Sequence, residues 1–73
     1  MQYETDKTLK RFGKRLKQLR ESKDISLNMF AYENDIPKSS LSKIENGIID
    51  FRFSTLLKIA NALEIPLSEL LDM

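Results

Sequence analysis

Apolar residues recur at intervals of three and four positions along most of this chain, a spacing that is typical of amphipathic helices. The first stripe of this kind comprises Leu9, Phe12, Leu16 and Leu19. It predicts a helix that runs to about Ser22, with Thr5 or Asp6 as its N-cap. A later stripe comprises Leu56, Ile59, Ala60 and Leu63. It predicts a helix over residues 55–63 with Ser54 as its N-cap.

Residues 26–47 predict two short helices joined by a tight turn. Ser26 is a suitable N-cap for the first of them. Pro37 suits the first position of the second, which we expect to cover residues 38–45. Gly47 is then placed to end this second helix in the left-handed backbone conformation. This segment is therefore a candidate helix-turn-helix unit.

The predicted helix over residues 38–45 has two distinct faces. At about 100° per residue, one side collects Pro37, Leu41 and Ile44, which can dock on a core. The opposite side carries Lys38, Ser39, Ser42 and Lys43. Lysine donates to phosphates or to guanine acceptors, and serine donates or accepts. The polar face therefore has the donors that a recognition helix needs in the major groove of DNA.

The remaining segments complete an all-α architecture. Asn34 and Asp35 favour a helix end, because both residue types tolerate left-handed backbone. Residues 67–71 can form a short last helix after the break at Pro66. We therefore expect a compact five-helix bundle, with residues 1–73 as a single domain and residues 1–5 as a flexible arm.

Composition narrows the classes of function. The chain has no Cys and no His, so a disulfide or a thiolate metal site cannot hold it together, and the usual catalytic nucleophile–base pairs are missing. Its start lacks the apolar core of a signal peptide, and its apolar runs are too short to span a membrane. We expect a cytoplasmic protein that is not an enzyme and that needs no metal or cofactor.

Charge is unevenly distributed, although the formal net charge is only +1. The first predicted helix and its end carry Lys7, Lys10, Arg11, Lys14, Arg15, Lys17, Arg20 and Lys23. Residues 60–73 contain Glu64, Glu69 and Asp72 and no basic residue. We expect most bases of the first helix to be solvated, with some of them near phosphates if the partner is DNA.

Arg20 differs from the other bases, because its angle places it at the edge of the apolar stripe. A partly covered arginine requires an acidic partner. Glu45, near the end of the predicted recognition helix, is the natural candidate. We therefore expect Arg20 and Glu45 to form a structural ion pair that does not touch bases.

Five segments follow one another in a characteristic order and spacing. They read FGKRLKQLR at 12–20, IS at 25–26, SSLSKIENG at 39–47, TLLKIANAL at 55–63 and LSELL at 67–71. Together they resemble the Cro/CI-type domain, also called the lambda-repressor-like or XRE-type helix-turn-helix domain. The resemblance covers nearly the whole chain.

This resemblance implies a domain that binds double-stranded operator DNA, usually as a homodimer on a palindrome, with its third helix in the major groove. Carried over by position, the candidate DNA-binding residues are Pro37, Lys38, Ser39, Ser42, Lys43, Asn28, Asn46 and Arg52. The family also pairs an arginine at position 20 with the glutamate at position 45. Small stand-alone members include phage-type repressors, restriction–modification controller proteins and antitoxins.

The chain departs from the family pattern at places that bear on DNA affinity. Leu27 stands where many members have a glutamine that can hold a phosphate. Asn34-Asp35 replaces the usual Leu-Gly at the turn. The segment after Gly47, which is often basic, retains only Arg52. Fewer cations release fewer counterions, so each monomer should bind more weakly and with less dependence on salt.

Two alternatives stay open. Ile48 and Ile49 either form an exposed dimer contact or fold back on the core. The function is either a sequence-specific transcriptional regulator or a protein-interaction module, such as an antitoxin or adaptor that keeps the fold without reading DNA. The weakly basic loop and its two isoleucines favour the module only modestly, and the recognition helix favours the regulator.

Overall fold

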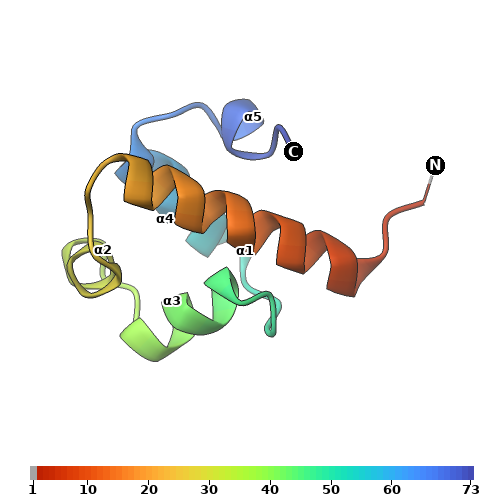
Figure 1. Ribbon diagram of the computed structural model, residues 1–73, viewed down its shortest axis with the longest axis horizontal. Coiled ribbons are helices and arrows are strands. Elements are labelled where there is room, and N and C mark those ends of the chain that lie inside the picture. The colour runs from red at the N-terminus through yellow and green to blue at the C-terminus, as the bar shows by residue number, and fades with distance from the viewer. Residues whose placement is uncertain (1) are drawn as a thin grey trace.

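The computed structural model describes residues 2–73 and contains five helices joined by short connections (Figure 1). They are α1 (Thr5–Ser22), α2 (Leu27–Glu33), α3 (Lys38–Glu45), α4 (Phe53–Leu63) and α5 (Leu67–Leu70). The predicted all-α, five-helix architecture is confirmed. Of the arm predicted over residues 1–5, Thr5 is already helical and residue 1 lies outside the described residues.

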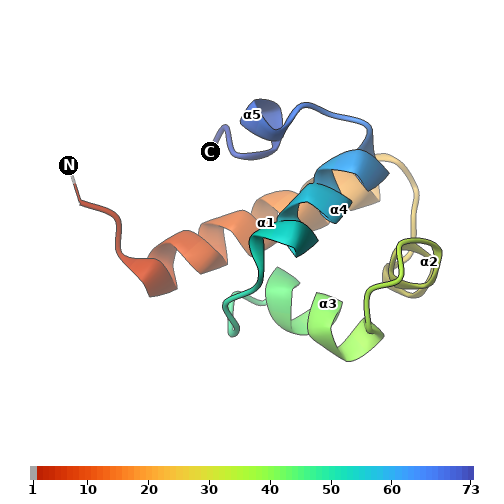
Figure 2. The ribbon, with the colours of Figure 1, turned by 180° about the vertical axis from the view of Figure 1, so that it is seen from behind.

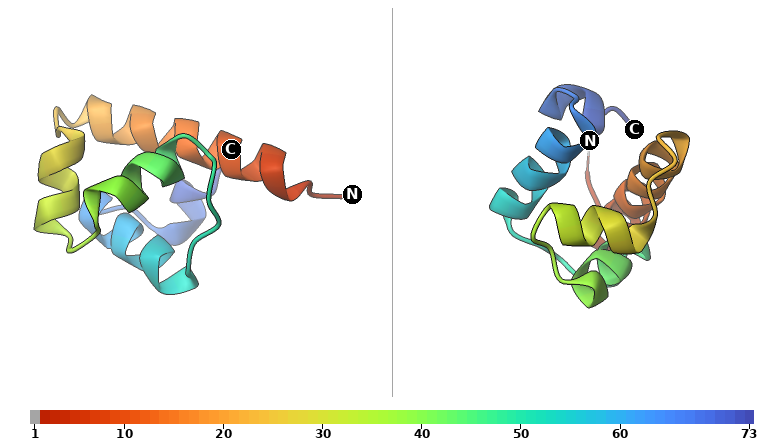
Figure 3. Two further views of the ribbon diagram at one scale, coloured as in Figure 1. Left: turned by 90° about the horizontal axis from the view of Figure 1, so that it is seen from below. Right: turned by 90° about the vertical axis from the view of Figure 1, so that its left-hand side faces the viewer.

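The long helix α1 crosses the molecule, and α3 and α5 lie on opposite sides of it. Figures 1 and 2 show this arrangement from the front and from behind, and the end-on view in Figure 3 agrees. The acidic C-terminal segment therefore lies on the side of α1 away from α3. The basic helix α1 thus stands between α3 and the acidic end, which it contacts through Arg15.

The core is built from the apolar positions of all five helices and of the turn before α3. Its buried members are Phe12, Leu16, Phe30, Ala31, Ile36, Leu41, Ile44, Leu56, Ile59, Ala60, Leu63 and Leu70. Pro37 is exposed and stands at the N-cap of α3, one position before the predicted one, so it does not dock on the core as its angle suggested. Within residues 2–73, no helix has both the length and the apolar character needed to cross a bilayer.

The N-cap predicted for α2 is present, whereas those predicted for α1 and α4 are not. The Ser26 hydroxyl accepts a hydrogen bond from the Met29 amide at 3.1 Å and caps α2 as expected. The caps predicted for α1 are wrong, because Glu4 occupies the N-cap and turns its carboxylate toward Lys7 instead. Ser54 is not a cap either. The chain enters α4 earlier, with Arg52 at the N-cap and its carbonyl accepting the first amide bonds.

Helix ends rely on left-handed residues more often than the sequence indicated. Asp35 (φ 54°) and Gly47 (φ 69°) adopt this conformation as expected, but Asn34 (φ −114°) does not. The Asn34 side chain instead donates to the Phe30 carbonyl at 2.8 Å. Asp24 (φ 58°) and Glu64 (φ 56°) are also left-handed. Aspartate tolerates this conformation, but the Cβ of Glu64 crowds the following carbonyl, so Glu64 strains the backbone.

The strain at Glu64 leads to a stability prediction. Because Glu64 is exposed and left-handed, Glu64→Gly should raise the free energy of unfolding by about 1 kcal/mol, which for a domain of this size raises the Tm by roughly 4–8 °C. Glu64→Ala is the matched control, because it removes the same charge but keeps the Cβ, and it should melt within about 0.5 kcal/mol of the parent. Equal gains from both variants in thermal denaturation would assign the effect to charge instead.

Two long-range contacts attach the C-terminal half to α1. Arg15 donates from Nε to the Leu70 carbonyl at 2.9 Å and from Nη2 to the Glu69 carbonyl at 2.6 Å, which satisfies carbonyls at the end of α5. The rings of Phe12 and Phe51 pack with centroids 5.2 Å apart. This ring contact holds the loop between α3 and α4 against the core.

The same loop contains Ile48 and Ile49, whose roles the sequence left open, and the two residues differ in burial. Ile49 is half-buried and packs against the core, whereas Ile48 is 64% exposed. The folded-back interpretation therefore holds for Ile49 only. Ile48 remains available to a partner.

Candidate nucleic-acid interface

Helix α3 ends in a tightly bonded turn. The Ile48 amide donates to the Lys43 carbonyl and the Gly47 amide to the Ile44 carbonyl, both at 3.1 Å, which is the pair of bonds that closes a helix around a left-handed residue. The Asn46 side chain adds a bond to the Ser42 carbonyl at 2.9 Å. These three hydrogen bonds therefore hold the C-terminal half of α3 in one conformation.

The two faces predicted for α3 are present, apart from Pro37. Leu41 and Ile44 are buried, with exposed fractions of 0% and 2%. On the opposite side Lys38, Ser39, Lys43 and Asn46 are exposed and Ser42 is half-buried. The donors of this outward face are thus free to meet a ligand while the apolar side anchors the helix.

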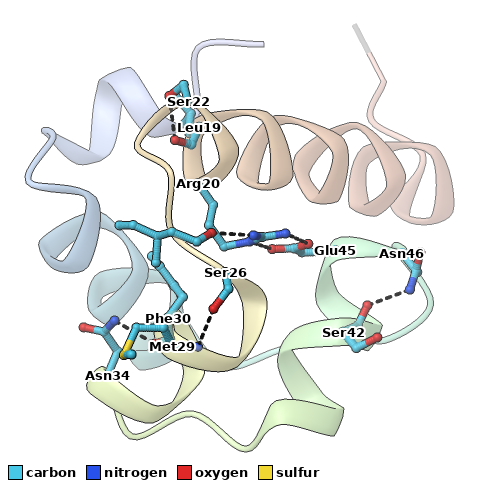
Figure 4. A network of polar contacts seen from close by, with 11 residues as sticks. Leu19, Arg20, Ser22, Ser26, Met29, Phe30, Asn34, Ser42, Glu45 and Asn46 are labelled. Carbon is cyan, nitrogen blue, oxygen red and sulfur yellow. Dashed lines mark hydrogen bonds and ion pairs between the residues drawn. The ribbon is translucent and has the colours of Figure 1, made fainter.

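An ion pair fixes α3 to α1. The Arg20 guanidinium donates from Nε to Glu45 Oε2 at 2.8 Å and from Nη2 to Glu45 Oε1 at 3.0 Å, in the bidentate geometry that Figure 4 shows. Its Nη1 donates to the Ile25 carbonyl at 2.6 Å. The two side chains expose only 8% and 6% of their surface. The pair expected from the helix angles is therefore present and also holds the connection between α1 and α2.

The electrostatics of this pair keep Arg20 charged. Its hydrogen bond to Glu45 raises the pKa of Arg20, and the nearby negative charge of Glu45 adds to this, while burial acts in the opposite direction. A raised pKa in the folded state means that the contribution of Arg20 to stability is fully present below the ordinary range of arginine. It is lost only as the pH rises through the raised value.

A glycine allows α1 and α3 to approach closely. Gly13 is buried, and a Cβ at this position would lie 2.5 Å from the Ile44 carbonyl oxygen, overlapping the Glu45 carbonyl as well. These are backbone atoms of the last turn of α3. The depth at which α3 sits on the bundle is therefore determined by the missing side chain of Gly13 as well as by the ion pair.

Helix α3 is flanked by a recess on each side. The larger, of about 400 Å³, is bounded by the turn before α3, the loop after it and α4, and it brings Arg52 together with Pro37 and Ser40. Two acids, Asp35 and Asp50, line the same recess and reduce its positive charge. The smaller recess lies on the α1 side and contains Ser42 and Asn46.

The remaining candidate, Asn28, is exposed on α2 and lines neither recess. Among residues 2–73, no three His, Cys, Asp or Glu side chains converge as metal ligands. Pro37 and Arg52 therefore share one recess beside α3, and Ser42 and Asn46 share the other, whereas Asn28 stands apart on α2.

Sequence reasoning missed two basic residues beside α3: Lys58, which lines the larger recess with Arg52, and Lys17. Lys17 lines the smaller recess beside Ser42 and Asn46, although the sequence grouped it with solvated bases. A signal for it existed, because Lys17 precedes Arg20 by three positions and therefore lies on a neighbouring part of the same helix face. Once Arg20 was expected to meet Glu45, Lys17 could have been placed next to α3.

A short helix that buries one side, offers donors on the other and follows a second helix after a tight turn defines a helix-turn-helix domain of the DNA-binding kind. Comparison with known proteins agrees. A family model described as a helix-turn-helix domain (HTH_19) matches residues 13–73, and the chain belongs to this XRE-type family of transcription regulators.

The chain is similar to named regulators in sequence and in structure. It is 44% identical over 61 residues to the control protein C.MunI from Mycoplasma sp., covering 82% of each chain. The crystal structure of the restriction-modification controller protein C.AhdI from Aeromonas hydrophila aligns with a TM-score of 0.81 and 34% identity, covering 85% of this chain and 94% of that one. These relatives are controller proteins, and the chain belongs with regulators and not with enzymes.

A larger regulator contains the same fold as one part. An HTH_3 family transcriptional regulator from Vibrio cholerae aligns with a TM-score of 0.84 and 31% identity. The alignment covers 92% of this chain and 38% of that one. The fold of this chain therefore occurs in a controller protein of similar length, and also as a minor part of a longer regulator.

Proposed function

We propose that this protein is a controller-type transcriptional regulator that recognises a palindromic operator in double-stranded DNA as a two-fold dimer. The observation that carries the proposal is the outward face of α3, where Lys38, Ser39, Ser42 and Lys43 gather on the side opposite the buried Leu41 and Ile44. This face contains no acid. Its donors match the acceptors that base edges and phosphates present in a major groove.

The controller assignment is supported by the relatives. C.MunI and C.AhdI both carry the name of controller proteins, and each alignment covers more than four-fifths of both chains. We infer that this chain acts as a single domain of the same kind, in the cytoplasm, on the promoter of a restriction–modification system. Ile48, which is exposed beside the end of α3, is available for contact with a second copy.

Within this surface we assign base contacts to Lys38, Ser39, Ser42 and Lys43, with Pro37 against a thymine methyl. Asn28, Asn46 and Arg52 are assigned to the DNA backbone. Backbone contacts fix the register of the helix and base contacts select the sequence. Substitutions in the two groups should therefore differ in their effect on sequence preference.

Selection of bound sites from random duplex DNA tests the proposal directly. A single enriched palindrome, bound at a stoichiometry of two chains per duplex in sedimentation, is the expected result. Affinity should fall as salt rises, with a slope that corresponds to several phosphates. Failure to bind any duplex at low salt would instead favour the protein-interaction module.

The assignment of the recognition face makes a separate prediction. Lys43→Ala and Lys38→Ala should each weaken binding to the selected palindrome by about tenfold or relax its sequence preference, because each removes a donor to base edges. Both side chains are exposed, so the Tm should stay within about 2 °C of the parent. Binding titrations on the palindrome and on single-base variants measure both effects. Unchanged affinity and preference in both variants would contradict the assignment.

A further inference from the structure

The smaller recess beside α3 joins three helices. It has a volume of about 210 Å³ and is lined by Lys17 and Arg20 of α1, Leu27 of α2, Ser42 and Glu45 of α3, and Asn46 at the C-cap of α3. Figure 4 shows Ser42 and Glu45 on α3 and Asn46 at its end, with Arg20 reaching Glu45 from α1. The recess therefore lies along the flank of α3 that faces α1.

The charge of this recess comes from Lys17. Arg20 and Glu45 neutralise each other, and the third contact of Arg20 is with the Ile25 carbonyl. Lys17 is exposed, and in the described part of the chain neither an ion pair nor a hydrogen bond occupies its ammonium group. The recess thus has one available cation, Lys17, in a lining that it shares with Ser42.

Lys17 lines the recess on one side of α3, where the phosphates of a bound DNA groove would lie. The major groove of B-DNA is about 12 Å wide, and an α-helix with its side chains is about 10–12 Å across, so a docked helix nearly fills the groove. The phosphates of the two groove walls then meet the residues that flank the helix. Arg52 stands in the recess on one flank of α3, and Lys17 stands in the recess on the other.

We propose that Lys17 and the Ser42 hydroxyl bind a backbone phosphate of the operator, on the wall of the groove that faces α1. The inference rests on the proposed function and assigns to Ser42 a phosphate instead of a base. Ammonium and hydroxyl groups both donate to phosphate oxygens, so the two side chains form a small anion site. Such a contact positions α3 in the groove and carries no sequence information.

The test compares Lys17→Gln with Arg11→Gln on the selected operator over a range of salt concentrations. Lys17→Gln removes one phosphate contact from each copy of the dimer, so it should weaken binding about five- to tenfold near 0.1 M salt and reduce the slope of log K against log[salt] by about 1.8, with base preference unchanged. Lys17→Arg should retain the parental slope. Melting curves of each variant verify that the fold is intact.

Arg11→Gln is the matched control, because it makes the same charge change on a part of α1 that does not line the recess beside α3. Arg11 lines a different recess, together with Arg15 and the C-terminal Met73. It lies six positions from Lys17, roughly 9 Å along the helix axis and about 120° around it, so salt near 0.1 M screens most of its effect. We expect less than a twofold change in affinity and an unchanged slope.

The outcomes separate the inference from the function on which it rests. If the parent binds the operator and Lys17→Gln keeps its affinity and slope, the phosphate site is wrong while the proposed function stands. Equal losses in the two glutamine variants would indicate a general charge effect and also overturn the site. If the parent binds no duplex DNA, the proposed function fails, and the site fails with it.

Discussion

Arg20→Ala is expected to lower the free energy of unfolding by about 3–5 kcal/mol. The substitution leaves the Glu45 carboxylate, which is only 6% exposed, without its bidentate partner and removes the donor to the Ile25 carbonyl. A loss of this size is a large share of the roughly 5–15 kcal/mol that stabilises a typical domain. Thermal or urea denaturation followed by circular dichroism measures the effect.

Two further variants identify the cause of this loss. Arg11→Ala removes an exposed arginine from the same helix and should change stability by no more than about 0.5 kcal/mol. The double variant Arg20→Met with Glu45→Met replaces the pair by apolar side chains and should recover much of the loss, because the unpaired buried charge is gone. An Arg20→Ala variant that melts like the parent would refute the structural role of the pair.

Because the pKa of Arg20 is raised, its share of this stability should not depend on pH in the neutral range. The folded-state pKa exceeds the unfolded one, so the contribution is complete below the unfolded value and disappears only above it. The difference in stability between the parent and Arg20→Lys should therefore arise from geometry, since lysine is also charged near pH 7 but cannot form the bidentate bond.

Gly13→Ala is the second large effect, and here two physical effects oppose each other. Alanine is favoured over glycine in a helix by about 1 kcal/mol. Its Cβ, however, would overlap the carbonyl groups of Ile44 and Glu45 in α3. Those atoms belong to the backbone and cannot turn aside as a flexible side chain could, so the two helices must separate. Overpacking against rigid backbone should cost about 3 kcal/mol, so we expect a net loss of about 2 kcal/mol.

The measurement for Gly13→Ala is the Tm together with amide chemical shifts along α3. The shifts should change most in the last turn of α3, because that turn is displaced. Lys14→Ala, at the exposed neighbouring position, is the control and should melt within about 0.5 kcal/mol of the parent. A Gly13→Ala variant that is more stable than the parent would show that helix propensity outweighs the packing.

The sequence predicted well those features that depend on one helix at a time. Apolar spacing identified the buried sides of α1, α3 and α4, because a residue's angle around a helix is determined by its position in the chain. Local chemistry identified the Ser26 cap and the left-handed Gly47. The pairing of Arg20 with Glu45 was accessible for the same reason, since both the angle of Arg20 and the burial cost of its charge can be judged from the sequence.

Helix starts were less predictable, because several residues near a boundary compete to occupy it. Ser54 has the chemistry of a cap, yet α4 begins before it. The ring of Phe51 packs on Phe12 and holds the loop close to the core, and Arg52 follows immediately at the N-cap. The start of α4 therefore coincides with the end of the loop that packs on the core, and not with Ser54, the residue that local capping chemistry favours.

The sequence by itself determined that this chain makes short amphipathic helices, which side of each is apolar, and that the helix over residues 38–45 presents lysines and serines. Only the tertiary structure decided which helix flank meets which neighbour. It placed Gly13 against the backbone of α3, Lys17 beside Ser42, and Arg15 at the end of α5. The physical reason is that periodicity describes rotation around one axis. The distance and angle between two axes depend on side chains from both helices at once.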